Sequence, residues 1–155
     1  GLMEPRTSTS LNRLRAVHEL SQAGVPVGVM MAPIIPGLNH TEIPSIIEAS
    51  AKAGALDAGY TVVRLNGQIA ELFEDWLNKK FPERASKVMN HIQSLHGGKP
   101  NDTNWQRRLK GDGEMASVIN QLFTSSKKRF FEGKKMPPYN MNLFRKGGNY
   151  SLFDC

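Results

Sequence analysis

The feature that most constrains this chain is the order of its apolar patterns over the first 65 residues. Residues 10–23 carry leucine and valine at helical spacing with Gly24 as the stop, and the valine-rich run 25–31 follows with the length of a strand. Three isoleucines at helical spacing then predict a second helix that ends at Gly54, and residues 60–65 predict a second strand. A helix–strand–helix–strand order with short connections is typical of a parallel α/β sheet.

The two predicted strands also indicate that this sheet needs neighbours. The run 25–31 is apolar almost throughout, which predicts a strand buried on both faces of a parallel sheet. Two parallel strands with open edges are not expected to be stable alone. We therefore expect partner strands N-terminal to Gly1, so that the chain would begin inside a domain.

Beyond residue 66 the pattern changes to helices only. Apolar stripes over 69–77, 85–95 and 115–123 predict three helices. The first stops at Phe81-Pro82, the second opens at Pro82 and closes at Gly97-Gly98, and the third ends at Lys127-Lys128-Arg129. From Glu132 the composition is mainly proline, glycine, asparagine and lysine. This composition predicts an extended tail. The expected segments are an α/β part over 1–66, a helical extension over 67–131 and a flexible basic tail over 132–155.

Positive charge is concentrated in the last third of the sequence. Residues 1–98 carry nine basic and nine acidic groups, whereas residues 99–155 carry eleven basic and five acidic groups, which accounts for the net charge of +6. This distribution favours an arm that contacts nucleic acid, and a solvated basic surface is the alternative. Candidate phosphate-binding residues are Arg107, Arg108, Lys110, Lys127, Lys128, Arg129, Lys134 and Lys135, with Trp105, Phe131 or Tyr139 free to stack on bases.

Cysteine and histidine usage argues against a metal site within this chain. The only cysteine is Cys155, so neither an internal disulfide nor an all-cysteine metal site can form. The histidines are not spaced as a helical metal pair, which favours surface or hydrogen-bonded roles for His18, His40, His91 and His96. We expect a cytoplasmic protein, since the sequence has no membrane-spanning run and no basic leader.

The loop after the first predicted strand is a candidate ligand site. Ligands of α/β proteins bind at the carboxyl ends of parallel strands, and residues 32–39 form such an end, with two prolines and a glycine stiffening the turn. Asn39 and Thr41 are candidate N-caps of the second helix, with Glu42 at the capping-box position after Asn39. The alternative is a rigid strand-to-helix turn that packs on its own helix.

Several runs of the sequence resemble a known family. They are Met3-Glu-Pro-Arg-Thr-Ser, Arg13-Leu-Arg-Ala-Val, and the stretch from Leu20 to Asn39, which reads LSQAGVPVGVMMAPIIPGLN. Together they resemble the fourth helix and fifth strand of bacterial radical S-adenosylmethionine proteins related to spore photoproduct lyase. Residues 42–65 look like the fifth helix and sixth strand, and Gly97-Gly-Lys-Pro-Asn-Asp and Tyr150-Ser-Leu-Phe also resemble the C-terminal part of that family.

This resemblance implies a fold and an activity for the parent protein. The fold would be α/β, the C-terminal part of a partial (β/α) barrel with parallel strands, followed by a helical region and an extended basic tail. Such proteins hold a 4Fe-4S cluster on a Cys-x3-Cys-x2-Cys loop, and the cluster cleaves S-adenosylmethionine to methionine and a 5′-deoxyadenosyl radical. That loop is absent here, so this chain would contribute part of the cofactor cavity and be inactive alone.

The resemblance further implies a lyase-like enzyme acting on nucleic acid, as in DNA repair. Its partner would be the N-terminal part of the same barrel, which would supply the cluster ligands. A non-catalytic, basic module that binds nucleic acid or protein is the alternative function.

The resemblance also assigns site residues by position. Pro33, Ile34 and Ile35 would lie beside the adenine of S-adenosylmethionine, and Arg64 and Leu65 would meet its polar edge through their backbone. The residues near the ribose and carboxylate would be Glu4, Arg6, Thr7, Ser8 and Arg13. Alternatively, Arg6 pairs with Glu4 and the hydroxyls from Thr7 to Ser10 only cap a helix.

The last residues suggest a second partner. Asn149-Tyr-Ser-Leu-Phe resembles the peptides by which bacterial repair proteins dock on the sliding clamp, with Leu152 and Phe153 entering an apolar pocket. The alternative is an apolar end that folds back on the parent domain.

Overall fold

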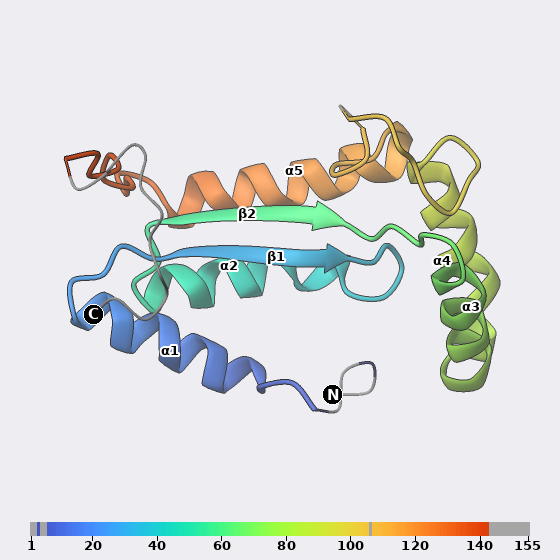
Figure 1. Ribbon diagram of the computed structural model, residues 1–155, viewed down its shortest axis with the longest axis horizontal. Coiled ribbons are helices and arrows are strands. Elements are labelled where there is room, and N and C mark those ends of the chain that lie inside the picture. The colour runs from blue at the N-terminus through green and yellow to red at the C-terminus, as the bar shows by residue number, and fades with distance from the viewer. Residues whose placement is uncertain (1–2, 4–5, 106, 143–155) are drawn as a thin grey trace, which may run out of the picture.

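A computed structural model describes residues 3, 6–105 and 107–142 of the chain (Figure 1). Within this part the fold is a two-stranded parallel sheet with five α-helices, which confirms the predicted α/β order. No helix of the described part is long and apolar enough to span a membrane. In chain order the elements are α1 (Ser10–Gln22), β1 (Gly28–Ile34), the short 3₁₀ helix η1 (His40–Glu42), α2 (Ile43–Lys52), β2 (Asp57–Val62), α3 (Ile69–Lys80), α4 (Pro82–Leu95) and α5 (Gly113–Phe130).

Strand β1 begins three residues after its predicted start at residue 25, and β2 begins three residues before its predicted start at residue 60. The ladder pairs Gly28 with Asp57 and continues to the end of β1, with an irregularity after Met31. Pro26 has no N–H to donate, so the apolar run cannot pair from its beginning. In β2, Asp57 and Gly59 join the ladder despite weak strand propensity, because pairing with a neighbour outweighs the preference of a single residue.

Only one face of the sheet is covered in the described chain. Ala58, Tyr60 and Val62 are buried there in one apolar core with residues of α2 and α5, and these two helices run along the strands (Figure 1). On the other face Met30 is 63% exposed and lies directly over Gly59. This face of β1 is open among the described residues, and burial of the strand on both faces stays a prediction that depends on the expected neighbouring strands.

A second apolar core lies at the carboxyl ends of the strands. Ile35, Val63 and Leu65 leave the sheet and pack against buried residues of α3 and α4, the two helices that stand at the right-hand end of Figure 1. The loop after β1 is thereby pressed onto α4. Gly37, at φ +82°, approaches Val88 so closely that a Cβ would lie 3.1 Å from its side chain, so the turn requires glycine.

Helix α1 is amphipathic, yet it has no buried residue. Leu11 is 79% exposed and Leu20 is 46% exposed, although both belong to the predicted apolar stripe. The helix also shields little of the neighbouring sheet, since Met30 remains open. Leu11 and Leu20 of the stripe are thus open within the described residues, whereas Val17 is partly buried against the first core.

The chain after α5 is anchored where it begins. Phe131 is buried in the first core, and the Lys134 ammonium donates hydrogen bonds to the carbonyls of Ala51 and Ala55 at the end of α2. Cations are favourable at this end of a helix because unpaired carbonyls and the helix dipole meet there. The first residues of the expected tail are therefore tied to α2.

Candidate functional site

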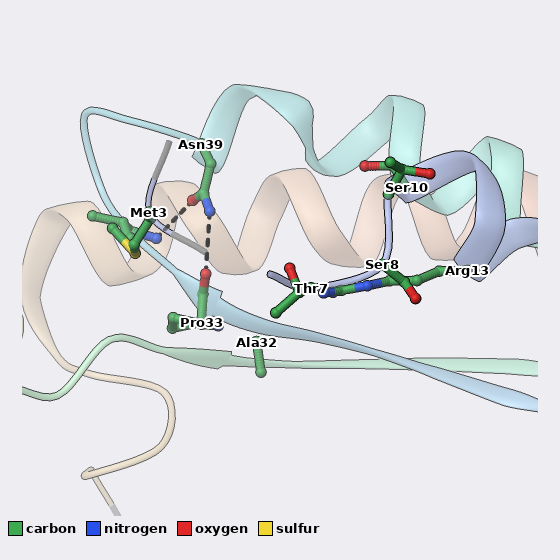
Figure 2. A pocket seen from close by; sticks show the side chains of 10 residues that line it. Met3, Thr7, Ser8, Ser10, Arg13, Ala32, Pro33 and Asn39 are labelled. Carbon is green, nitrogen blue, oxygen red and sulfur yellow. Dashed lines mark hydrogen bonds between the residues drawn. The ribbon is translucent and has the colours of Figure 1, made fainter. Parts of the chain in front are cut away.

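A cavity of about 460 Å³ lies at the carboxyl end of β1. One wall comes from the segment that leads into α1 and from the first turn of that helix, and the other comes from the end of β1 and the loop behind it (Figure 2). The carboxyl end of a parallel strand is the usual place for ligands in α/β folds. The lining residues are Met3, Thr7, Ser8, Thr9, Ser10, Arg13, Ala32, Pro33, Ile35 and Asn39.

The Asn39 side chain stabilises the wall that the end of β1 contributes to this cavity. Its Oδ1 accepts a hydrogen bond from the Ile35 N–H at 2.7 Å, and its Nδ2 donates to the Pro33 carbonyl at 3.1 Å (Figure 2). The prediction that this residue caps the second helix is wrong, because its side chain makes no cap bond. The amide instead satisfies two backbone groups left over where the strand ends.

The opposite wall is set by the start of α1. Thr9 is its N-cap and accepts a hydrogen bond from the Asn12 N–H at 3.3 Å, which confirms a predicted cap in this hydroxyl-rich stretch. Figure 2 shows the Arg13 side chain running beside Ser8 toward Thr7. A guanidinium next to hydroxyl groups can bind a carboxylate or a sugar.

The cavity continues beneath α1. An adjoining space of about 270 Å³ is mainly apolar and shares Ser10, Arg13, Ala32, Pro33 and Asn39 with the first. A polar end next to an apolar floor is the usual composition of a small-molecule pocket. The two spaces together can hold a ligand that has one charged end and one flat apolar end.

Five residues that the family resemblance assigned to the cofactor meet in the main cavity: Thr7, Ser8, Arg13, Pro33 and Ile35. Ile34 is 2% exposed and packs in the sheet core, where it borders only the adjoining apolar space.

Other assigned residues do not line the main cavity. Leu65 is buried in the second core, and its N–H donates to the Pro100 carbonyl at 3.0 Å, so this backbone donor is already used. Arg64 and Arg6 do not line the cavity either, and Glu4 falls outside the described residues. Ala32 and Asn39 line the cavity as expected for the predicted ligand loop 32–39, whereas no site prediction covered the lining residues Met3, Thr9 and Ser10.

Two of the predicted nucleic-acid-binding lysines are turned onto β2. The Lys127 ammonium donates to the Ala58 carbonyl at 2.9 Å and pairs with the Asp57 carboxylate. The Lys110 ammonium donates to the Tyr60 carbonyl at 3.0 Å and lies 3.3 Å from the centre of the Tyr60 ring. Burial, and then the charge of Lys127, hold the pKa of Lys110 below its usual value.

The predicted arginines also contact other residues of the chain. Arg107 pairs with the largely buried Asp102 at 2.9 Å, and the Arg108 guanidinium lies 4.1 Å from the centre of the Trp105 ring. Arg129 lies over Phe130, at 5.0 Å from its ring centre. Lys128 is exposed on α5.

The described residues offer no metal centre. They contain no group of three or more histidine, cysteine or acidic side chains that could hold an ion. The His40 Nδ1 accepts a hydrogen bond from the Gly37 N–H, and the buried His96 contacts the Val63 carbonyl through Nε2 at 2.8 Å. Cys155 lies outside the described residues, as do Leu152 and Phe153 of the predicted clamp-binding peptide.

Comparison with family models, curated proteins and solved structures gave no match for this chain.

Proposed function

We propose that this chain supplies one wall of the S-adenosylmethionine cavity of a radical S-adenosylmethionine protein of the spore photoproduct lyase-like kind. The observation that carries the proposal is the meeting of Ser8, Arg13 and Pro33 at the carboxyl end of β1. These residues come from two elements and line a single cavity. The family resemblance had assigned the three to the same cofactor from their positions alone.

The donor set fits the chemistry of this cofactor. The Arg13 guanidinium suits the carboxylate of the methionine part, and the hydroxyls of Thr7 and Ser8 suit the ribose. Ala32 and Pro33 offer an apolar surface to a flat ring, and Asn39 holds that surface in place through its two backbone hydrogen bonds. A cavity of about 460 Å³ is within the usual size for a cofactor site.

The iron–sulfur cluster does not fit the described residues, which hold no group of metal-ligating side chains. Its ligands would belong to the N-terminal part of the same barrel. When bound beside a reduced cluster, S-adenosylmethionine supplies a radical that abstracts hydrogen from the substrate. The task of this chain would be to bind and orient the cofactor and to keep water from one side of it.

The uncovered surfaces support such a partner. The face of the sheet that bears Met30 and the apolar stripe of α1 that bears Leu11 are both open in the described chain. In a barrel with helices outside, the face opposite α2 and α5 would point to the barrel interior. The missing part of the barrel is thus proposed to close over the cofactor from this side.

Calorimetric titration of the chain with S-adenosylmethionine tests the proposal. We expect saturable binding, weak because only one wall is present, and a loss of at least about tenfold in Arg13→Ala, as for a lost charged hydrogen bond. Arg15→Ala is the matched control, since this residue is on the same helix, pairs with Glu19 and does not line the cavity.

Two results would overturn the proposal. One is no binding at about 1 mM cofactor, the weakest affinity that we regard as specific. The other is an equal loss of affinity in the two variants, which would reveal a general effect of charge on α1. A nucleic-acid substrate stays a prediction from the resemblance and the basic composition.

A further inference from the structure

A second cavity, of about 490 Å³, lies where the loop after β1 meets α4 and the beginning of α5. It shares no lining residue with the cavity at the end of β1. Its lining is basic and contains no carboxylate. The residues are Gly37, His40, Arg84, Lys87, Val88, His91 and Met115.

Helix α4 places three of the basic side chains on one face. Arg84, Lys87 and His91 follow one another at spacings of three and four residues, which are neighbouring positions on a helix. Neither Arg84 nor Lys87 forms an ion pair with any described residue, and both are exposed. Glu114 borders a separate neighbouring space that shares only His91 and Met115 with this cavity.

His40 adds a further donor from the opposite side. Its Nδ1 accepts the Gly37 N–H at 3.1 Å, so the neutral ring carries its proton on Nε2. The close approach of Gly37 to Val88 seats this loop against α4. The donors around the cavity are therefore held by two elements that pack directly on each other.

We propose that this cavity binds a phosphate group, carried either by a nucleotide or by a nucleic-acid backbone. Arginine binds two phosphate oxygens at once, lysine adds a compact positive charge, and imidazole N–H groups donate to the remaining oxygens. Several cations around one concave space without a counter-charge repel one another, and a bound dianion removes that repulsion. The site is separate from the proposed cofactor cavity and does not depend on it.

The test is a titration of the chain with inorganic phosphate, followed by backbone amide NMR. We expect saturable shifts at Gly37, His40 and the facing residues of α4. Arg84→Gln/Lys87→Gln should weaken binding by at least about tenfold, because two charge-assisted contacts are lost. Lys79→Gln/Lys80→Gln is the matched control, since it removes the same charge from exposed positions on α3 that do not line the cavity.

Further titrations distinguish the two sources of phosphate. A nucleoside monophosphate that binds more tightly than inorganic phosphate, while a short single-stranded oligonucleotide does not, would assign the site to a nucleotide. An oligonucleotide that displaces phosphate, and that loses affinity in Arg84→Gln/Lys87→Gln only, would assign it to a backbone. The proposal fails if phosphate does not saturate the wild-type chain, or if the control variant loses as much affinity as the cavity variant.

Discussion

Two groups of basic side chains in this molecule have similar composition and opposite surroundings. Lys110, Lys127 and Lys134 direct their ammonium groups to backbone carbonyls of β2 and of the end of α2. Arg84 and Lys87 on α4 border an open cavity and have no ion-pair partner among the described residues. The first group stabilises the fold, whereas the second is available to a ligand.

The difference shows that local charge density is a poor guide to binding. The first group lies in the basic last third of the sequence, where a nucleic-acid contact was predicted, and the second lies in the electrically balanced part. A lysine whose hydrogen bonds are used within the fold must give them up before it can contact a phosphate. Availability depends on packing, which composition does not report.

Replacing Lys127 is expected to have the largest effect on stability. Lys127→Met loses a charged hydrogen bond to Ala58 and the ion pair with Asp57, while the side chain is 37% exposed and therefore partly screened by water. We expect a decrease of about 1.5 kcal/mol in the free energy of unfolding, measured by urea denaturation.

The neighbouring residue provides the control for this experiment. Lys128 is exposed on the same helix and makes no ion pair among the described residues, so Lys128→Met should change stability by less than about 0.5 kcal/mol. Equal effects of the two substitutions would show that the contacts of Lys127 with β2 do not stabilise the fold. The difference between the two groups of basic side chains would then be lost.

The helices could be predicted from sequence far better than the strands or the site. Predicted and observed helices agree closely because helical periodicity and the stops at Gly24 and Phe81-Pro82 act within a few residues. The predicted strand bounds differ from the observed ones because the register of a strand depends on the strand with which it pairs. Ser8, Arg13 and Pro33 were assigned by resemblance, and no local pattern could show that the start of α1 meets the end of β1.

The predicted cofactor residues that do not line the cavity have a comparable cause. Arg64 and Leu65 were expected at the ligand, but the segment after Pro100 returns along β2, where Leu109 accepts from the Val62 N–H and Pro100 accepts from the Leu65 N–H. The basic cavity was missed although Arg84, Lys87 and His91 have helical spacing. The sequence signal was present, yet the contribution of His40 requires a tertiary contact.

His40, which lines the same cavity as the second group, should make the stability of the protein depend on pH. Burial, and then the charge of His91, hold the pKa of His40 below its usual value of 6.5, and Arg84 and Lys87 line the same cavity. As pH falls through about 6.5 the unfolded chain binds a proton more readily than the folded chain, so the free energy of unfolding decreases. Protonation of Nδ1 would also remove the acceptor for the Gly37 N–H.

Urea denaturation at several pH values between about 5 and 8 measures this effect. His40→Gln should flatten the decrease on the acidic side, whereas His18→Gln, at an exposed position of α1, should leave the pH profile unchanged. A profile that is the same in wild type and His40→Gln would show that His40 does not couple protonation to folding.

The smallest expected effect on stability is the most informative for the comparison of the two groups. Arg84→Gln/Lys87→Gln removes two exposed charges that have no ion-pair partner in the described chain, so the free energy of unfolding should change by no more than about 0.5 kcal/mol. Relief of repulsion among the cavity cations could even raise it slightly at low salt, and added salt should remove that gain.

The two groups would then show opposite responses to the loss of charge. Lys127→Met should lower stability without changing phosphate binding, and Arg84→Gln/Lys87→Gln should weaken phosphate binding without lowering stability. Thermal unfolding with and without phosphate measures both properties at once, because a ligand that binds only the folded state raises the midpoint. A large loss of stability in Arg84→Gln/Lys87→Gln would mean that these cations support the fold, as the lysines on β2 do, and the contrast between the two groups would disappear.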